Sequence, residues 1–188
     1  MTDRACLCAR KNPPLRPFLS SFFLTFALMQ SDEHWMRMAL AEARQAADEG
    51  EVPIGAVIVA DDCIIGSGHN RTEALADVTA HAEMIAITSA SERLGGKYLN
   101  ACTLYVTVEP CTMCAGALGW SQIGRVVFGT SDPKRGYQLF APRALHPRCY
   151  VTAGILGDEC AELLRAFFKE RRPANSSKKS DTSARQHG

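Results

Sequence analysis

Two short motifs, each at a predicted helix start, constrain the fold of this chain more than any other feature. In the first, Glu83 follows His81 by two residues; in the second, Cys114 follows Cys111 by three, directly after Pro110. Residues three apart share one face of a helix, so both sulfurs can reach one ion. We expect both cysteines in the first helical turn, where the helix dipole favours thiolates. If the motifs form one site, the fold must bring two helix starts together.

The residue types in these motifs are those of a zinc site with an open position. Two thiolates, from Cys111 and Cys114, and one neutral imidazole, from His81, suit zinc and leave one tetrahedral position for water. A closed structural site needs a fourth protein ligand, and the sequence has no second CxxC and no HxxxH. Glu83 does not share a helix face with His81, which makes it a poor ligand and a reasonable general base. We therefore predict hydrolytic chemistry with Glu83 as the catalytic residue.

Helical and extended patterns alternate along the chain between residues 31 and 172. Helix 31–49 is predicted between a cap at Ser31 or Asp32 and a stop at Gly50. The other predicted elements are strand 52–60, strand 63–68, helix 79–94, strand 103–108, helix 111–120, strand 125–129, strand 149–152 and helix 158–172. Residues 130–147 show no clear periodicity. The alternation predicts a three-layer α/β/α domain around a five-stranded sheet.

Length and composition fit one soluble domain with two extensions. The chain has 188 residues, of which 46% are hydrophobic and 22% charged. We predict that the domain spans residues 31–172. Residues 1–28 are predicted to be either unstructured or upstream of the true translation start at Met29. The apolar run 18–28 within them is shorter than the roughly 20 residues that cross a bilayer. Residues 173–188, rich in Ser and Lys, are predicted to form a basic disordered tail.

Charge is unevenly distributed along the chain. Between residues 31 and 168, 17 Asp and Glu outnumber 11 Lys and Arg, whereas residues 169–188 carry six Lys and Arg against two acids. An acidic body with a basic end suggests that a polyanion is bound mainly at the C-terminal end. The same residues are equally compatible with a frayed terminus that is only solvated and binds no polyanion.

Over residues 33–172 the chain resembles the bacterial tRNA-specific adenosine deaminase family. The matching segments are 51–57, 79–83, 104–117, 124–129, 157–161 and 167–172, and the spacing of His, Glu and the two Cys is the signature of zinc deaminases. The resemblance implies a cytidine deaminase-like fold with a mixed sheet and one zinc per subunit. It also implies hydrolysis of adenosine to inosine at the wobble position of a tRNA anticodon stem–loop, by a cytoplasmic homodimer without membrane attachment.

The resemblance also assigns substrate-binding residues outside the two motifs. Asn70 matches a position that hydrogen-bonds the flipped base, and Asp132 a loop position that faces the neighbouring nucleotides. The full set of expected substrate contacts is Asn70, Glu109, Asp132, Phe168, Arg171 and Arg172. Asn70 as a simple turn residue, and the basic helix end as a solvated surface, remain open alternatives. The segment 137–147 differs from the glycine-rich version of the best-known family members.

Three other functions are compatible with parts of the pattern. A deaminase of guanine, cytosine or cytidine uses the same zinc site, but needs a closed lid over a small pocket where RNA needs an open groove. A non-catalytic zinc module that binds nucleic acid has no need of the acid–base residue Glu83. A thiol redox protein uses CxxC without zinc. Thiolate ligands are best preserved in reducing surroundings, which favours the cytoplasm.

Overall fold

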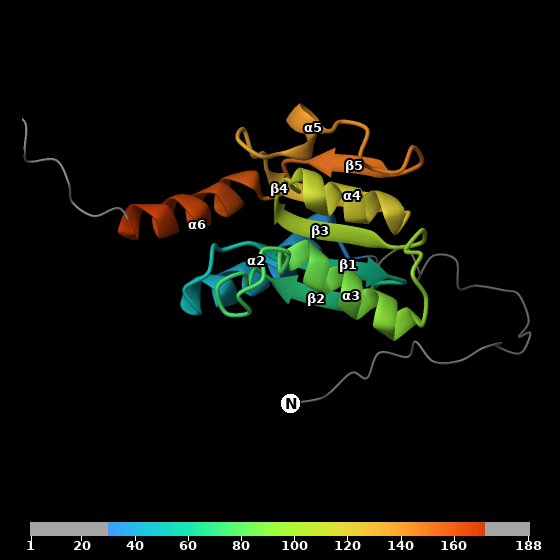
Figure 1. Cartoon of the computed structure of the whole chain (residues 1–188), viewed down its shortest axis with the longest axis horizontal. Helices are drawn as coiled ribbons and strands as arrows, with labels where there is room; N and C mark the ends of the chain where they lie inside the picture. The colour runs from blue at the N-terminus through green and yellow to red at the C-terminus, as the bar shows by residue number, and fades with distance from the viewer. Residues whose placement is uncertain (1–29, 172–188) are drawn as a thin grey trace, which may run out of the picture.

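The computed structural model describes residues 30–171, in which a mixed five-stranded sheet lies between two layers of helices (Figure 1). The predicted α/β/α architecture is confirmed. The elements are α2 (Asp32–Asp48), β1 (Gly55–Ala60), β2 (Cys63–His69), α3 (Ala82–Leu94), β3 (Thr103–Val108), α4 (Thr112–Trp120), β4 (Arg125–Thr130), α5 (Tyr137–Phe140), β5 (Tyr150–Ala153) and α6 (Gly157–Glu170). The predicted extension 1–28, the predicted tail 173–188 and Arg172 lie outside the described residues.

The strand order is β2-β1-β3-β4-β5, with β1 antiparallel to both neighbours and β3, β4 and β5 parallel. The hairpin between β1 and β2 turns at Asp61 and Asp62, as predicted. Both have positive φ, 48° and 55°, which is the backbone of the two-residue turn that matches strand twist. The parallel strands place the residues that follow β3 and β4, among them Cys111 and Asp132, at the same edge of the sheet.

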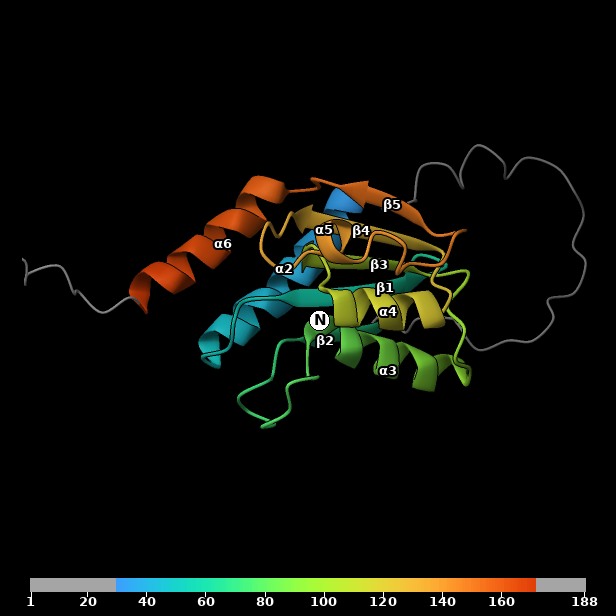
Figure 2. The same ribbon diagram turned by 45° about the horizontal axis from the view of Figure 1, so that its top comes forward.

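Side chains alternate between the two faces of the sheet and bury both. Ala56 and Ile58 of β1 belong to a core that includes residues of α3 and α4. Val57 and Val59 belong to a second core with residues of α2 and α6. Burial on both faces explains why the central strands are continuously apolar. Figure 2 shows α3 and α4 side by side on one face of the sheet, with α2 on the other.

Helix α2 is fixed to the sheet through its first turn. The Ser31 hydroxyl caps the helix by accepting the His34 N–H at 3.2 Å. Asp32 then accepts two hydrogen bonds from the Arg125 guanidinium, at 2.8 and 2.7 Å, and one from the Tyr105 hydroxyl at 2.8 Å. One carboxylate therefore connects α2 to both β3 and β4.

Helix α3 lies unusually close to β2 because the facing residues are small. Ala82, Ala86 and Ala90 are fully buried. Ala86 and Ala90 lie over Gly66 of β2, and Ala82 lies over Gly68. A Cβ added at Gly66 would come within 2.5 Å of the Ala86 carbonyl oxygen and 2.6 Å of the Ala90 nitrogen. Only glycine permits this approach, and the approach determines how far the start of α3 stands from the sheet.

Several predicted boundaries differ from the structure. Strand β1 begins at Gly55 rather than residue 52, since Pro53 has no N–H to offer a sheet ladder. Helix α3 begins at Ala82 rather than residue 79, and α4 at Thr112. The stretch 130–147 contains the short helix α5. Among the described residues, no helix combines the length and apolar character needed to cross a bilayer.

Candidate active site

The two sequence motifs meet at the starts of α3 and α4. His81 is the N-cap of α3 and Cys111 the N-cap of α4, each with extended backbone angles and without a side-chain capping bond. The prediction that Cys111 lies in the first helical turn is wrong by one position, and His81, expected inside the helix predicted from residue 79, also precedes its helix. Because an N-cap residue has extended backbone angles, its side chain does not lie on a face of its own helix. The side chains of His81 and Cys111 can therefore point toward each other. Cys114 lies in the first turn of α4, as predicted, and is completely buried.

The three ligand atoms have the spacing of a zinc site. The His81 Nδ1 lies 3.4 Å from the Cys114 Sγ and 3.7 Å from the Cys111 Sγ, and all three atoms lie within 4.8 Å of one another. Tetrahedral bonds of about 2.3 Å to sulfur and about 2.0 Å to nitrogen give a nitrogen–sulfur separation of roughly 3.5 Å. Within residues 30–171 no fourth His, Cys, Asp or Glu joins the group, and three protein ligands are the number that a catalytic zinc site uses.

The electrostatics of the cluster suit a cation. A hydrogen bond from the Cys114 thiol to the Cys111 sulfur lowers the pKa of Cys111 to about 4, and a hydrogen bond from His81 acts in the same direction. The same pairing with Cys111 raises the pKa of His81 above its ordinary value. The pKa of Cys111 is thus lowered toward the thiolate, the form of cysteine that binds a metal, whereas the hydrogen bond from Cys114 to Cys111, together with burial, raises the pKa of Cys114.

Glu83 lies beside this cluster in the first turn of α3. Its side chain is only 3% exposed, and burial raises the pKa of its carboxyl above the ordinary value. A carboxyl whose pKa is raised is a stronger proton acceptor when ionised, which suits a residue that takes and returns a proton. Glu83 is not part of the ligand group, in agreement with the expectation from its spacing.

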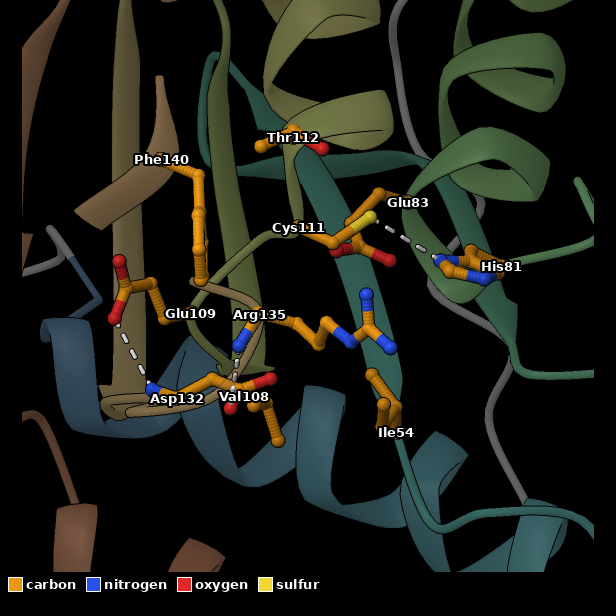
Figure 3. A pocket seen from close by; sticks show the side chains of 10 residues that line it. All are labelled: Ile54, His81, Glu83, Val108, Glu109, Cys111, Thr112, Asp132, Arg135 and Phe140. Atoms are coloured by element: carbon orange, nitrogen blue, oxygen red, sulfur yellow. Dashed lines mark hydrogen bonds between the residues drawn. The ribbon is translucent and has the colours of Figure 1, made fainter. Parts of the chain in front are cut away.

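The cluster opens into a pocket of about 560 Å³, a volume in the range of small-molecule sites. Figure 3 shows the side chains that line it: Ile54, His81, Glu83, Val108, Glu109, Cys111, Thr112, Asp132, Arg135 and Phe140. His81, Glu83 and Cys111 lie on one side, and the segment after β4 supplies the other. Three of the predicted site residues, together with the predicted contacts Glu109 and Asp132, thus line one space.

Glu109 and Asp132 are both engaged with backbone groups of the segment after β4. The Glu109 carboxylate accepts the N–H groups of Asp132 at 3.1 Å and Gln138 at 3.0 Å. A Cβ added at Gly136 would come within 2.5 Å of that carboxylate, so a larger residue there would have to displace the Glu109 side chain. The observed contacts of Glu109 therefore position the pocket wall, a role that the sequence interpretation did not include.

Asn70 is buried next to an acidic residue that the sequence analysis did not single out. Its Nδ2 donates to Glu51 at 3.0 Å and to the Thr72 hydroxyl at 3.2 Å. Glu51, 1% exposed, also accepts the N–H groups of Glu73 and Ala74 at 2.9 and 2.8 Å. The position of Glu51 directly before an apolar strand is the sequence feature that could have identified it as a buried acid. Asn70 is not among the residues that line the pocket.

The predicted contacts at the end of α6 lie in a second, adjoining groove. This groove has a volume of about 740 Å³ and includes Phe168 and Arg171. Phe168 is 48% exposed. The Arg171 guanidinium donates to the Gly50 carbonyl and lies 4.2 Å from the centre of the Phe167 ring. Arg171, which the sequence predicts to contact the substrate, therefore already makes contacts within the protein.

Comparison with known proteins extends these observations. A model of the cytidine and deoxycytidylate deaminase zinc-binding region matches residues 29–130. The tRNA-specific adenosine deaminase of Agrobacterium fabrum is 46% identical over 149 residues, which are 77% of this chain and 98% of that protein.

Solved structures agree with the fold. One comes from studies of A-to-I editing by tRNA:A34 deaminases at the wobble position of transfer RNA. It matches with a TM-score of 0.66 and 46% identity, over 70% of this chain and 99% of that one. A guanine deaminase from Nitrosomonas europaea matches with a TM-score of 0.63 and 24% identity, over 85% and 98% of the two chains. At that identity the second likeness establishes the shared fold alone.

Proposed function

The chain belongs to the cytidine and deoxycytidylate deaminase family, and from this premise we propose that it hydrolyses adenosine to inosine at the wobble position of a tRNA anticodon. One observation carries the proposal: His81, Cys111 and Cys114 converge on one point, with Glu83 beside them, at the wall of one pocket. The 46% identity to a tRNA-specific adenosine deaminase supports adenosine in tRNA as the substrate.

The proposed roles follow from the arrangement of the side chains. His81, Cys111 and Cys114 hold one zinc ion, which when bound supplies a Lewis acid that makes a water molecule nucleophilic near neutral pH. Glu83 accepts a proton from this water on its carboxylate as the water oxygen adds to C6 of adenine. Glu83 delivers this proton to the adjacent ring nitrogen. It then takes the remaining proton of the hydroxyl added at C6 and passes it to the amino group, which leaves as ammonia as the C6 carbonyl forms.

We assign the binding of the base and its neighbours to the surrounding residues. Because Glu51 and Thr72 hold the Nδ2 of Asn70, the side-chain oxygen of Asn70 is the group that it offers to a base. Asp132 lines both the pocket and the adjoining groove and is assigned to the nucleotides beside the target. Phe168, Arg171 and Arg172 are assigned to the anticodon loop.

An open groove beside the pocket favours RNA over a free base. The groove and the pocket adjoin, because both are lined by Ile54, Val108, Asp132 and Arg135. A polynucleotide can follow the groove while one flipped base enters the pocket. We further propose that residues 31–172 form the catalytic domain and that the enzyme acts as a homodimer on the anticodon stem–loop in the cytoplasm.

A direct assay tests the proposed function. The purified chain is incubated separately with an anticodon stem–loop that carries adenosine at the wobble position, with guanine and with cytidine, and ammonia and inosine are measured. We expect inosine from the stem–loop and about one zinc per chain by elemental analysis. Ammonia from guanine or cytidine, with none from the stem–loop, contradicts the proposal. A zinc content near zero instead supports a thiol redox role.

A further inference from the structure

The groove beside the pocket is rich in positive charge, but its cations are not equivalent. They come from the segment after β4 and from the second half of α6, and are Lys134, Arg135, Arg165, Lys169 and Arg171. Arg165 forms an ion pair with Glu162 at 3.2 Å, and Arg171 is bound to the Gly50 carbonyl. Within residues 30–171, Lys134, Arg135 and Lys169 form no ion pair. These three are available to an external anion.

Arg135 differs from the other two because it lines both the groove and the pocket. Figure 3 shows its side chain extending into the pocket on the side of Ile54. The carboxylates that share this wall are already engaged. Glu109 accepts the N–H of Asp132, and Asp132 accepts the N–H groups of Lys134 and Arg135, at 2.8 and 3.1 Å. Among the described residues, the Arg135 guanidinium therefore remains without an ion-pair partner beside two acids.

The backbone that carries Arg135 is held in place next to a proposed zinc ligand. Gly136 forms an isolated β-bridge with Cys111, and the Tyr137 N–H donates to the Pro110 carbonyl at 2.9 Å. Tyr137 is itself buried. A guanidinium on such a fixed backbone loses less freedom when it binds than one on a mobile loop. The position of the Arg135 backbone relative to Cys111 is thus built into the fold.

We propose that Arg135 binds a phosphodiester group that flanks the nucleotide whose base occupies the pocket. The planar guanidinium fork matches the oxygens of a phosphate, and the groove leads the chain of phosphates past it. A free base or nucleoside lacks this anion, so Arg135 selects a nucleotide within an RNA chain. The inference rests on the proposed function and adds a specificity-determining residue to it.

The first test measures binding as a function of salt. Glu83→Gln serves as the background, so that the stem–loop is bound without turnover, and Arg135→Gln is added to it. Each phosphate contact contributes about 0.7 to the slope of log affinity against log salt for a single strand. We expect Arg135→Gln to reduce the slope by about this amount. Arg148→Gln is the matched control: it removes the same charge, and Arg148 lines a separate pocket with Asn100 and Gly124, before β3 and β4.

The second test identifies the phosphate. Stem–loops with a neutral methylphosphonate on the 5′ or the 3′ side of the target adenosine are prepared. Their affinities are measured for the Glu83→Gln protein with and without Arg135→Gln. One of the two is expected to weaken binding to the Arg135-containing protein roughly tenfold, as for a charge-assisted hydrogen bond, with no further loss in Arg135→Gln. In turnover, Arg135→Gln should raise KM with little change in kcat, and Arg135→Lys should restore part of the loss.

The outcomes separate this inference from the proposed function. If the unsubstituted enzyme produces no inosine from the stem–loop, the proposed function fails, and the inference with it. If it produces inosine but Arg135→Gln leaves the salt slope unchanged, or Arg148→Gln has the same effect, only the role of Arg135 is overturned. The role of Arg135 is also overturned if the loss of affinity from Arg135→Gln adds to the loss from each of the two methylphosphonates.

Discussion

At the scale of single residues, three buried carboxylates lie in or near the pocket and they have different surroundings. Glu51 and Glu109, 1% and 6% exposed, accept backbone N–H groups and thereby hold the loops after β2 and β4. Glu83 instead faces the charges of Cys111 and His81. A buried carboxylate whose oxygens accept backbone N–H groups serves to hold the backbone in place. A buried carboxyl beside the proposed zinc ligands, such as Glu83, is suited to proton transfer.

The substitution Glu83→Gln tests this distinction. The amide keeps the size of the side chain and adds no unpaired charge to the buried site, so folding and zinc content should remain. Because an amide cannot accept and return the proton, kcat should fall by about a thousandfold or more. Inosine production and elemental analysis measure the two effects.

Glu92→Gln provides the matched control on the same helix, at an exposed position. It should leave both turnover and zinc content unchanged. Turnover that survives in Glu83→Gln removes Glu83 from the mechanism. Loss of zinc in that variant means instead that Glu83 helps to maintain the metal site.

At the scale of elements, the attachment of α2 to the sheet depends on one ionised side chain. Asp32 receives the Arg125 guanidinium in a two-pronged ion pair, with side chains 28% and 33% exposed. This hydrogen bonding from Arg125 lowers the pKa of Asp32 below its ordinary value. The negative charge also lies in the first turn of α2, where the helix dipole favours it. Loss of the charge should therefore loosen α2 from β3 and β4.

This pairing predicts a pH-dependent stability. A carboxyl whose pKa is depressed by folding stabilises the native state above its unfolded pKa, near 3.9. That stabilisation is lost as the pH falls through the lower folded value. Asp32→Asn should lower the free energy of unfolding by about 1–2 kcal/mol at pH 7. The difference from the unsubstituted protein should shrink as the pH is lowered from 5 toward 3.

Urea unfolding at several pH values measures this difference. Glu33→Gln is the comparison, because Glu33 pairs with Arg37 on the exposed side of the same helix at 3.2 Å, and it should have little effect at any pH. A difference for Asp32→Asn that does not change with pH would show that the ionised carboxylate is not what holds α2.

At the scale of the whole molecule, apolar side chains remain accessible on the outer face of α4. Met113 and Ala117 are partly exposed, and Trp120 is 87% exposed. They follow one another at spacings of four and three, so they lie on one face of the helix. Leu139 and Phe140 of α5, which contacts α4, are also exposed. A second copy of the chain is the partner that we propose for this surface.

The mass of the protein in solution tests the proposed dimer. We expect twice the chain mass of 20.5 kDa by light scattering at micromolar concentration. Trp120→Glu places a charge in the centre of the apolar face and should shift the protein toward the monomer. A monomeric mass for the unsubstituted chain contradicts the proposal. An unchanged dimer in Trp120→Glu places the interface elsewhere.

Local patterns in the sequence determine the elements and the chemical type of the site. The apolar runs of β1, β3 and β4 and the cap at Ser31 act over a few residues, and the spacing of Cys111 and Cys114 reflects one helical turn. These features are therefore readable without the fold. The alternation of elements also suffices for the three-layer architecture, since each apolar face must be covered.

Only the tertiary structure decided which distant groups meet. The closeness of His81 to the two sulfurs depends on how deeply α3 lies over Gly66, and the wall that carries Arg135 depends on the backbone contacts of Glu109 and Cys111. Arg171 looked available in the sequence, yet its guanidinium is bound to Gly50. Contacts between residues far apart in the chain depend on packing distances of a few ångströms, and no local pattern of residues encodes those distances.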